Sequence, residues 1–183
     1  MTELATFCRQ VQARSDEHRR AIAKLHPAEL HGQVVAILRQ EIDSMVRVIY
    51  LLSIPDHERR DELVKACVDG KQWTHPESKR RITDREMVDL ANRLQGWTES
   101  VYRFGCAFIH LSSFHDYNDR DPMEMISDDE RGAILNHMRH YHGGPSGPRP
   151  SFRELVPYLP QVFNKVASNL EHYVNDLAEG GHA

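Results

Sequence analysis

Apolar residues recur at three- and four-residue steps along most of the chain, which is the spacing that amphipathic helices produce. The clearest run lies between residues 28 and 53. Its apolar positions are Leu30, Val34, Ile37, Leu38, Ile42, Met45, Ile49 and Leu52. Pro27 suits the start of this helix, and Pro55 ends it. We therefore expect this segment to be the central helix of the fold.

Other segments carry the same helical spacing. The further predicted helices cover residues 3–24, 56–68, 84–113, 127–141 and 160–177, with a short helical turn from residue 151. The capping pairs that mark three of these starts are Thr83 with Glu86, Ser127 with Glu130, and Ser151 with Glu154. The helix over 3–24 is expected to be peripheral, because its middle is very polar.

These patterns predict an all-α fold. No segment alternates apolar and polar residues with the period of two that a strand requires, and no internal repeat or domain linker is present. We expect a bundle of about four long helices and two short ones. Residues 1–183 should form a single domain.

Composition narrows the class of protein. The hydrophobic fraction of 40% and the charged fraction of 27% are ordinary for a globular domain, and the formal net charge of −4 argues against bulk attraction to nucleic acid. Three widely spaced cysteines, Cys8, Cys67 and Cys106, indicate free thiols in a reducing compartment. The chain shows no secretory leader and no apolar run of about 20 residues, so we expect a cytoplasmic protein without membrane contact.

The longest predicted helix, residues 84–113, carries Arg103 and His110 seven residues apart. Seven residues are nearly two helical turns, so both side chains should project from one face, off the apolar stripe. The small residues from Gly105 to Ala107 should let a substrate or another backbone approach closely. Arginine offers a fixed fork of donors to phosphate oxygens, and histidine exchanges protons near neutrality. This pair suits a phosphodiester.

The run from Tyr102 to Ser112, Tyr-Arg-Phe-Gly-Cys-Ala-Phe-Ile-His-Leu-Ser, resembles the Arg-x4-6-His motif of the HEPN superfamily. The resemblance implies a helical bundle of a defence or toxin-antitoxin system that cleaves RNA without a metal or other cofactor. It also implies that Arg103 and His110 of two protomers meet across a homodimer interface. The His would assist attack of a ribose 2′-OH and the Arg would stabilise the transition state. A cognate antitoxin or neighbouring protein would be a partner.

A helical arginine leans toward the N-terminus of its helix, away from His110 of its own chain, which also favours a site shared by two protomers. The plainer interpretation is that Arg103 makes a surface ion pair and His110 a core or interface hydrogen bond. Arg131 and His137 are a second pair at similar spacing, so the motif alone does not single out one site.

A second rank of candidates surrounds the motif. These expected substrate-binding residues are Ser112, Ser113, His115, Asp116, Lys79, Arg80 and Arg81. The loop after His110 could orient that histidine, although a simple turn is the plainer interpretation. The basic run could bind an RNA backbone, although a solvated loop beside acidic residues is the plainer interpretation.

Two other classes of function remain open. One is a catalytically inactive helical module that binds RNA or protein. The other is a metal-dependent bundle of the DinB-like kind, in which His137, His140 and His115 would be the ligands, because neutral imidazoles three residues apart share a helical face.

Overall fold

The computed structural model describes residues 2–181, and its regular structure is helical. Its α-helices are α1 (Glu3–Leu25), α2 (His31–Leu52), α3 (His57–Val68), α4 (Asp84–Gln95), α5 (Thr98–Ile109), α6 (Asp128–His142), α7 (Phe152–Leu155) and α8 (Leu159–Ala178). Short 3-10 helices η1 (Ser113–Asp116), η2 (Pro122–Glu124) and η3 (Val156–Tyr158) lie between them. No strand occurs between residues 2 and 181, so the predicted all-α bundle is confirmed.

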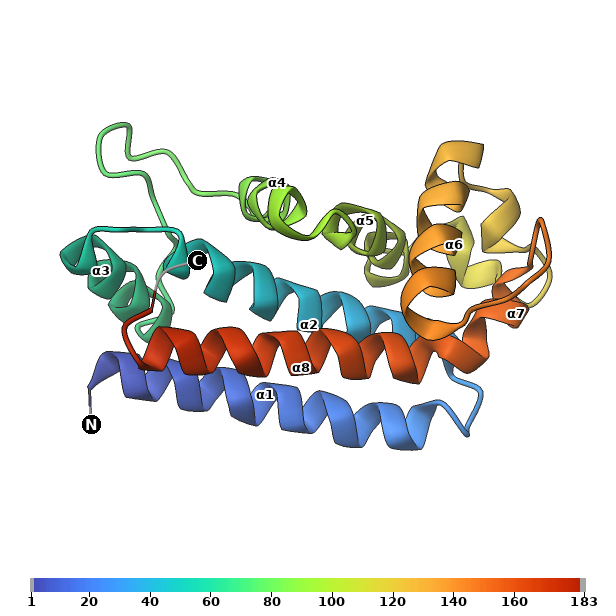
Figure 1. Ribbon diagram of the computed structural model, residues 1–183, viewed down its shortest axis with the longest axis horizontal. Helices are drawn as coiled ribbons and strands as arrows, with labels where there is room; N and C mark the ends of the chain where they lie inside the picture. Colours follow the sequence, from blue (N-terminus) through green and yellow to red (C-terminus); the bar gives the residue numbers. More distant parts are fainter. Residues whose placement is uncertain (1, 182–183) are drawn as a thin grey trace.

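Helix α2 is the centre of the bundle, as its apolar pattern predicts. It packs against α1 and α8 on one side and against α4 and α5 on the other (Figure 1). The side chains of Ile42, Met45 and Ile49 are fully buried along it. Helix α3 closes one end of the bundle, and α6 with α7 closes the other. The candidate site residues on α5 therefore lie near the α6 end.

Helix α1 lies at the edge of the bundle, in keeping with its polar middle, but that middle is not wholly exposed (Figure 1). It packs on α8, α3 and α2, and part of its polar middle is buried. His18 Nδ1 lies 2.6 Å from Glu41 Oε2, and the hydroxyl of Ser15 donates to the other oxygen of the same carboxylate. Glu41 is 0% exposed. Buried carboxylates require such partners, so this cluster joins α1 to α2.

The predicted helix over 84–113 is broken, which is the main departure from expectation. Gly96 adopts a left-handed conformation with φ 75°, and its N–H bonds to the carbonyl of Asn92 to end α4. The side chain of Asn92 then accepts the N–H of Glu99 at 3.2 Å in the first turn of α5. The apolar stripe continues across the break because Trp97 and Val101 still pack against the core.

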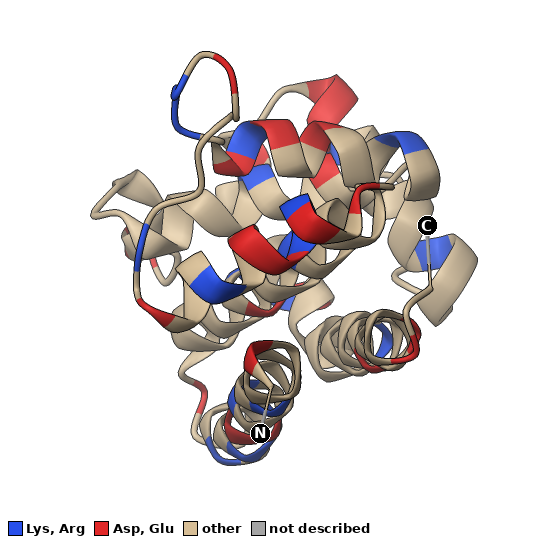
Figure 2. Ribbon diagram, turned by 90° about the vertical axis from the view of Figure 1, so that its left-hand side faces the viewer, with Lys and Arg blue, Asp and Glu red and all other residues tan. Residues whose placement is uncertain are grey.

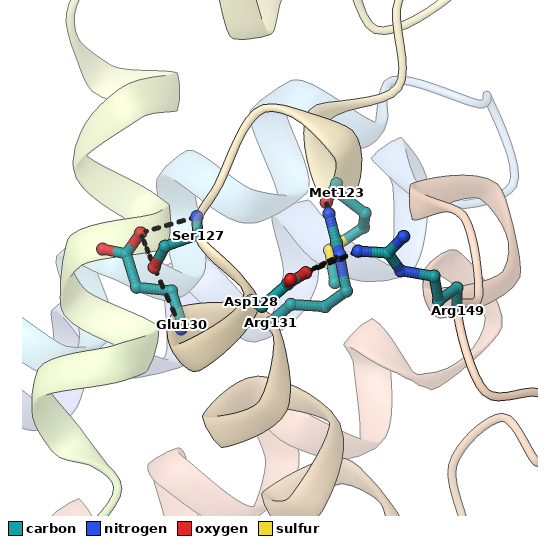
Figure 3. Close-up of polar contacts among 6 residues, drawn as sticks. All are labelled: Met123, Ser127, Asp128, Glu130, Arg131 and Arg149. Atoms are coloured by element: carbon teal, nitrogen blue, oxygen red, sulfur yellow. Dashed lines mark hydrogen bonds and ion pairs between the residues drawn. The ribbon is translucent and has the colours of Figure 1, made fainter.

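Capping at Ser127 and Ser151 agrees with the prediction. Glu130 accepts the N–H and hydroxyl of Ser127 at 3.3 and 3.1 Å, and the Ser127 hydroxyl accepts the N–H of Glu130 (Figure 3). Glu154 accepts the N–H of Ser151 at 2.8 Å. At Thr83 only half of the box forms, because the carboxylate of Glu86 pairs with other residues.

The cysteines and the apolar character of the helices can also be compared with expectation. Cys8, Cys67 and Cys106 are all free thiols, as their spacing indicates. Within residues 2–181, none of the helices combines the length and apolar character that crossing a bilayer requires.

Candidate functional site

The structure places Arg103 within α5 and His110 at the C-terminal end of that helix. Arg103 lies on α5, but α5 ends at Ile109, and His110 is its C-cap residue with an extended backbone. The N–H of His110 still bonds to the carbonyl of Cys106 at 3.3 Å, so the residue closes the last turn of the helix. The shared face of the two side chains stays a prediction. Both side chains are exposed. In the described part of the chain, the imidazole of His110 makes no hydrogen bond with Arg103 or His115.

Arg103 is held by an ion pair to the neighbouring helix. Its Nη2 lies 2.7 Å from Oε1 of Glu130 on α6, and the arginine side chain is 56% exposed. The other oxygen of Glu130 serves the Ser127 cap (Figure 3). Glu130 thus fixes both the start of α6 and the position of the guanidinium. Exposed pairs of this kind contribute only about 0.2–1 kcal/mol, so phosphate can compete for Arg103.

The surroundings of Arg103 are acidic. A cavity of about 430 Å³ beside it is also lined by Glu99, Asp129 and Glu130, together with the aromatic rings of Phe104 and Phe114. Three carboxylates therefore accompany one guanidinium. The excess of negative charge around Arg103 weakens its attraction for a polyanion such as RNA. The Arg-x4-6-His motif gives no sign of these carboxylates.

The small residues of α5 make room for a side chain of the same protein. The side chain of Arg39 from α2 lies against Gly105, and its Nε donates to Cys106 Sγ at 3.2 Å. Its guanidinium stacks 3.4 Å from the ring centre of Tyr102 and pairs with Asp43 at 2.5 Å. The expected space for a substrate or another backbone is therefore occupied.

Burial of the Tyr102 hydroxyl at this contact changes its pKa. It raises the pKa of Tyr102 to about 12, although the charge of Arg39 acts in the opposite direction. Sequence reasoning missed Arg39. The available signal was an Arg–Asp pair four residues apart on an otherwise apolar helix.

The segment after His110 is a compact turn. The hydroxyl of Ser112 donates to the carbonyl of Ala107 at 2.6 Å and accepts the N–H of Phe114, while His115 Nδ1 lies 3.3 Å from the Ser112 nitrogen. Ser113, His115 and Asp116 are exposed in η1. Ser112 and His115 therefore cap a turn, which is the plainer of the two interpretations.

The basic run at residues 79–81 lies far from α5's C-terminal end. It belongs to the loop between α3 and α4, at the opposite end of the molecule from α6 (Figure 1). Arg80 pairs with Glu86 at 2.5 Å. Seen from this end, basic segments alternate with acidic ones and form no continuous basic face (Figure 2). Lys79, Arg80 and Arg81 are therefore not brought to the motif.

The competing pair at Arg131 and His137 has a structural role. Arg131 is buried, its Nε donates to the carbonyl of Met123 at 2.8 Å, and its Nη1 bonds Asp128 at 2.6 Å (Figure 3). Arg149 reaches the same Asp128 carboxylate at 2.5 Å. These contacts hold the loop before α6 in place. The guanidinium of Arg131 is engaged in them and is not available to a substrate.

The metal alternative finds no geometric support. Within residues 2–181, no three side chains of His, Cys, Asp or Glu are arranged to hold a metal ion. His115, His137 and His140 are therefore not gathered into one ligand set. His137 instead lines a cavity between α5, α6 and α8.

Comparison with known proteins adds no family. The chain matches no protein-family model, no curated protein and no solved structure. The functional argument consequently depends on the residues and their geometry.

Proposed function

We propose that two copies of this chain form a metal-independent endoribonuclease of the HEPN kind, with Arg103 and His110 as its catalytic residues. The observation that carries the proposal is the surface around His110. Ile109 is 41% exposed and Leu111 is 95% exposed on either side of it. Fully burying an exposed leucine or isoleucine contributes roughly 1.5–3 kcal/mol. Leu111 would gain nearly all of this and Ile109 less than half, so an interface between copies is favourable at this position.

A two-fold interface would bring the segments of both protomers together, because the same patch is used on each copy. His110 of one protomer could then lie beside Arg103 of its partner. Arg103 remains reachable because it is exposed and its pair with Glu130 is weak. We further propose that the protein acts in the reducing cytoplasm and that a partner protein, such as a cognate antitoxin, covers the same surface.

The proposed chemistry is a transesterification. The neutral imidazole of His110 takes the proton of a ribose 2′-OH, and the oxygen attacks the adjacent phosphorus. The bond from phosphorus to the 5′ oxygen breaks, and that oxygen takes a proton from solvent. The guanidinium of Arg103 stabilises the charge on the phosphoryl oxygens. The products are a 2′,3′-cyclic phosphate and a free 5′-OH.

The direct test is cleavage of single-stranded RNA in the presence of EDTA, with analysis of the ends. We expect 2′,3′-cyclic phosphate ends, and loss of at least about 100-fold in rate for His110→Ala. His140→Ala, an exposed histidine on α6, is the matched control and should retain activity. Equal activity in wild type and His110→Ala would contradict the proposal.

Glu130 offers a second test with an unusual sign. Glu130→Gln keeps a residue that suits the capping box but removes the charge that competes with phosphate for Arg103. We expect the catalytic efficiency, kcat/KM, to rise by up to about fivefold, which corresponds to an exposed ion pair of about 1 kcal/mol. A fall in efficiency with unchanged stability would mean that Glu130 assists the reaction.

A further inference from the structure

A second cavity, of about 320 Å³, is lined mainly by residues of α4, α5, α6 and α8 and does not include Arg103. Phe104 and Ile134 line both cavities and form the wall between them. The remaining lining is mostly apolar and includes Trp97 and Val162. Small-molecule sites have volumes from about 300 Å³ upward and walls of this character, so the cavity has the size and surface of a ligand site.

The polar groups around this cavity are basic or neutral. They are Gln95, His137, Tyr141, His142, Lys165 and Asn169, and none of the lining residues is Asp or Glu. Lys165 is exposed and has no ion-pair partner in the described part of the chain. The neighbouring cavity at Arg103 is lined by three carboxylates. The cavity at Lys165 thus has a cation at its lining and no carboxylate to compete for it, which suits the carboxylate of a small ligand.

The titration of His142 agrees with this arrangement. Burial lowers the pKa of His142, and the charge of Lys165 lowers it further. His142 and Lys165 are thus two basic groups at one cavity, near enough for their positive charges to repel. An anionic group at this position would relieve that repulsion.

Gln95, which lines this cavity, has an amide oxygen without a hydrogen-bond partner among the described residues. Its amide nitrogen donates to the hydroxyl of Tyr173 at 2.7 Å, while its buried Oε1 has no hydrogen-bond partner within residues 2–181. Buried polar atoms are nearly always paired, so one that lines a cavity points to a missing partner. Exchange of the amide oxygen and nitrogen would present a donor at the same position.

We propose that this cavity binds a small amphiphilic anion, whose apolar chain lies between α5, α6 and α8 and whose carboxylate pairs with Lys165. The site uses none of the residues of the proposed ribonuclease centre. Its ligand class follows from two features, an apolar lining that rewards a hydrocarbon chain and an unpaired cation at its edge.

The test measures binding of decanoate below its micellar concentration by isothermal calorimetry and by the fluorescence of Trp97, which lines the cavity. We expect saturable one-to-one binding, with affinity rising about fourfold for each added CH2 from hexanoate to decanoate. Decanol and decylammonium carry the same ten-carbon hydrocarbon chain without the negative charge. Both should bind at least about tenfold more weakly than decanoate.

Two variants identify the anion contact. Lys165→Met should weaken decanoate binding about tenfold and leave decanol unchanged. Asn169→Glu, which lines the cavity one turn further along α8, should have the same effect because a carboxylate there pairs with Lys165. Lys65→Met on α3, at the other end of the bundle, is the matched control.

Each contrary outcome is decisive. Absence of saturable decanoate binding, or equal binding of decylammonium, would overturn the proposal. So would unchanged decanoate affinity in both Lys165→Met and Asn169→Glu, provided that circular dichroism shows both variants to be folded. RNA cleavage is not a readout here, so this proposal and the ribonuclease proposal fail separately.

Discussion

Gly105 provides a sharp test of how α5 is held against α2. A Cβ added at this position would lie 2.6 Å from Cβ of Arg39 and 3.2 Å from its Cγ. Arg39 cannot easily move away, because it is buried, paired with Asp43 and stacked on Tyr102. Gly105→Ala should therefore destabilise the protein, although alanine is the better helix former.

The magnitude follows from a matched pair of glycines. At Gly132 in α6 an added Cβ meets no atom within 4 Å, so Gly132→Ala should stabilise by up to about 1 kcal/mol. Gly105→Ala has the same gain in helix propensity, but the overpacking against Arg39 should lower its free energy of unfolding by about 1–3 kcal/mol. The free energies of unfolding of the two variants should thus differ by about 1–3 kcal/mol, which corresponds to about 2–12 °C in Tm.

Urea unfolding and calorimetry measure this difference. Removing the obstacle supplies the control. The nearest atom is Cβ of Arg39, so Gly105→Ala should lose its penalty in an Arg39→Gly background and lose it only in part in an Arg39→Ala background. If Gly105→Ala and Gly132→Ala stabilise equally, the contact with Arg39 is wrong.

Further predictions concern pH and the buried polar cluster. Burial lowers the pKa of His31, His137 and His142 in the folded protein, so the unfolded chain takes up protons first as the pH falls. Stability is therefore complete above an unfolded pKa of about 6.5 and should decrease below it. Tm should fall between about pH 7.5 and 5.5, and a rising Tm would contradict this cause. His18→Ala should cost about 1–3 kcal/mol in urea unfolding because Glu41 loses a buried partner, whereas no change would show that the cluster is not needed.

Much of the fold could be predicted because local signals and burial agree. The apolar spacing of α2 identified the central helix, and the serine caps placed the starts of α6 and α7. The break at Gly96 escaped prediction because the apolar residues on both sides keep one phase, which hides a glycine that ends a helix. A hydrophobic pattern records which residues face the core and not whether the backbone between them is continuous.

The candidate site was less predictable, because it depends on contacts between distant segments. Spacing alone could identify Arg103 and His110, but the acidic neighbours of Arg103 come partly from α6. The occupant of the space beside Gly105 comes from α2, about 66 positions away in sequence. Likewise Arg39 and Glu41 are charged residues on the largely apolar α2. The partners of Glu41 lie on α1, and Arg39 contacts Cys106 on α5 in addition to Asp43 on α2.

The most direct test of the central claim is complementation between two inactive chains. Arg103→Ala and His110→Ala proteins are each assayed for RNA cleavage, then unfolded, mixed in equal amounts and refolded together. A site built from Arg103 of one protomer and His110 of the other leaves one intact site in each mixed dimer, so about a quarter of wild-type activity should return. No recovery from a mixture shown to contain mixed dimers would contradict a site shared between protomers.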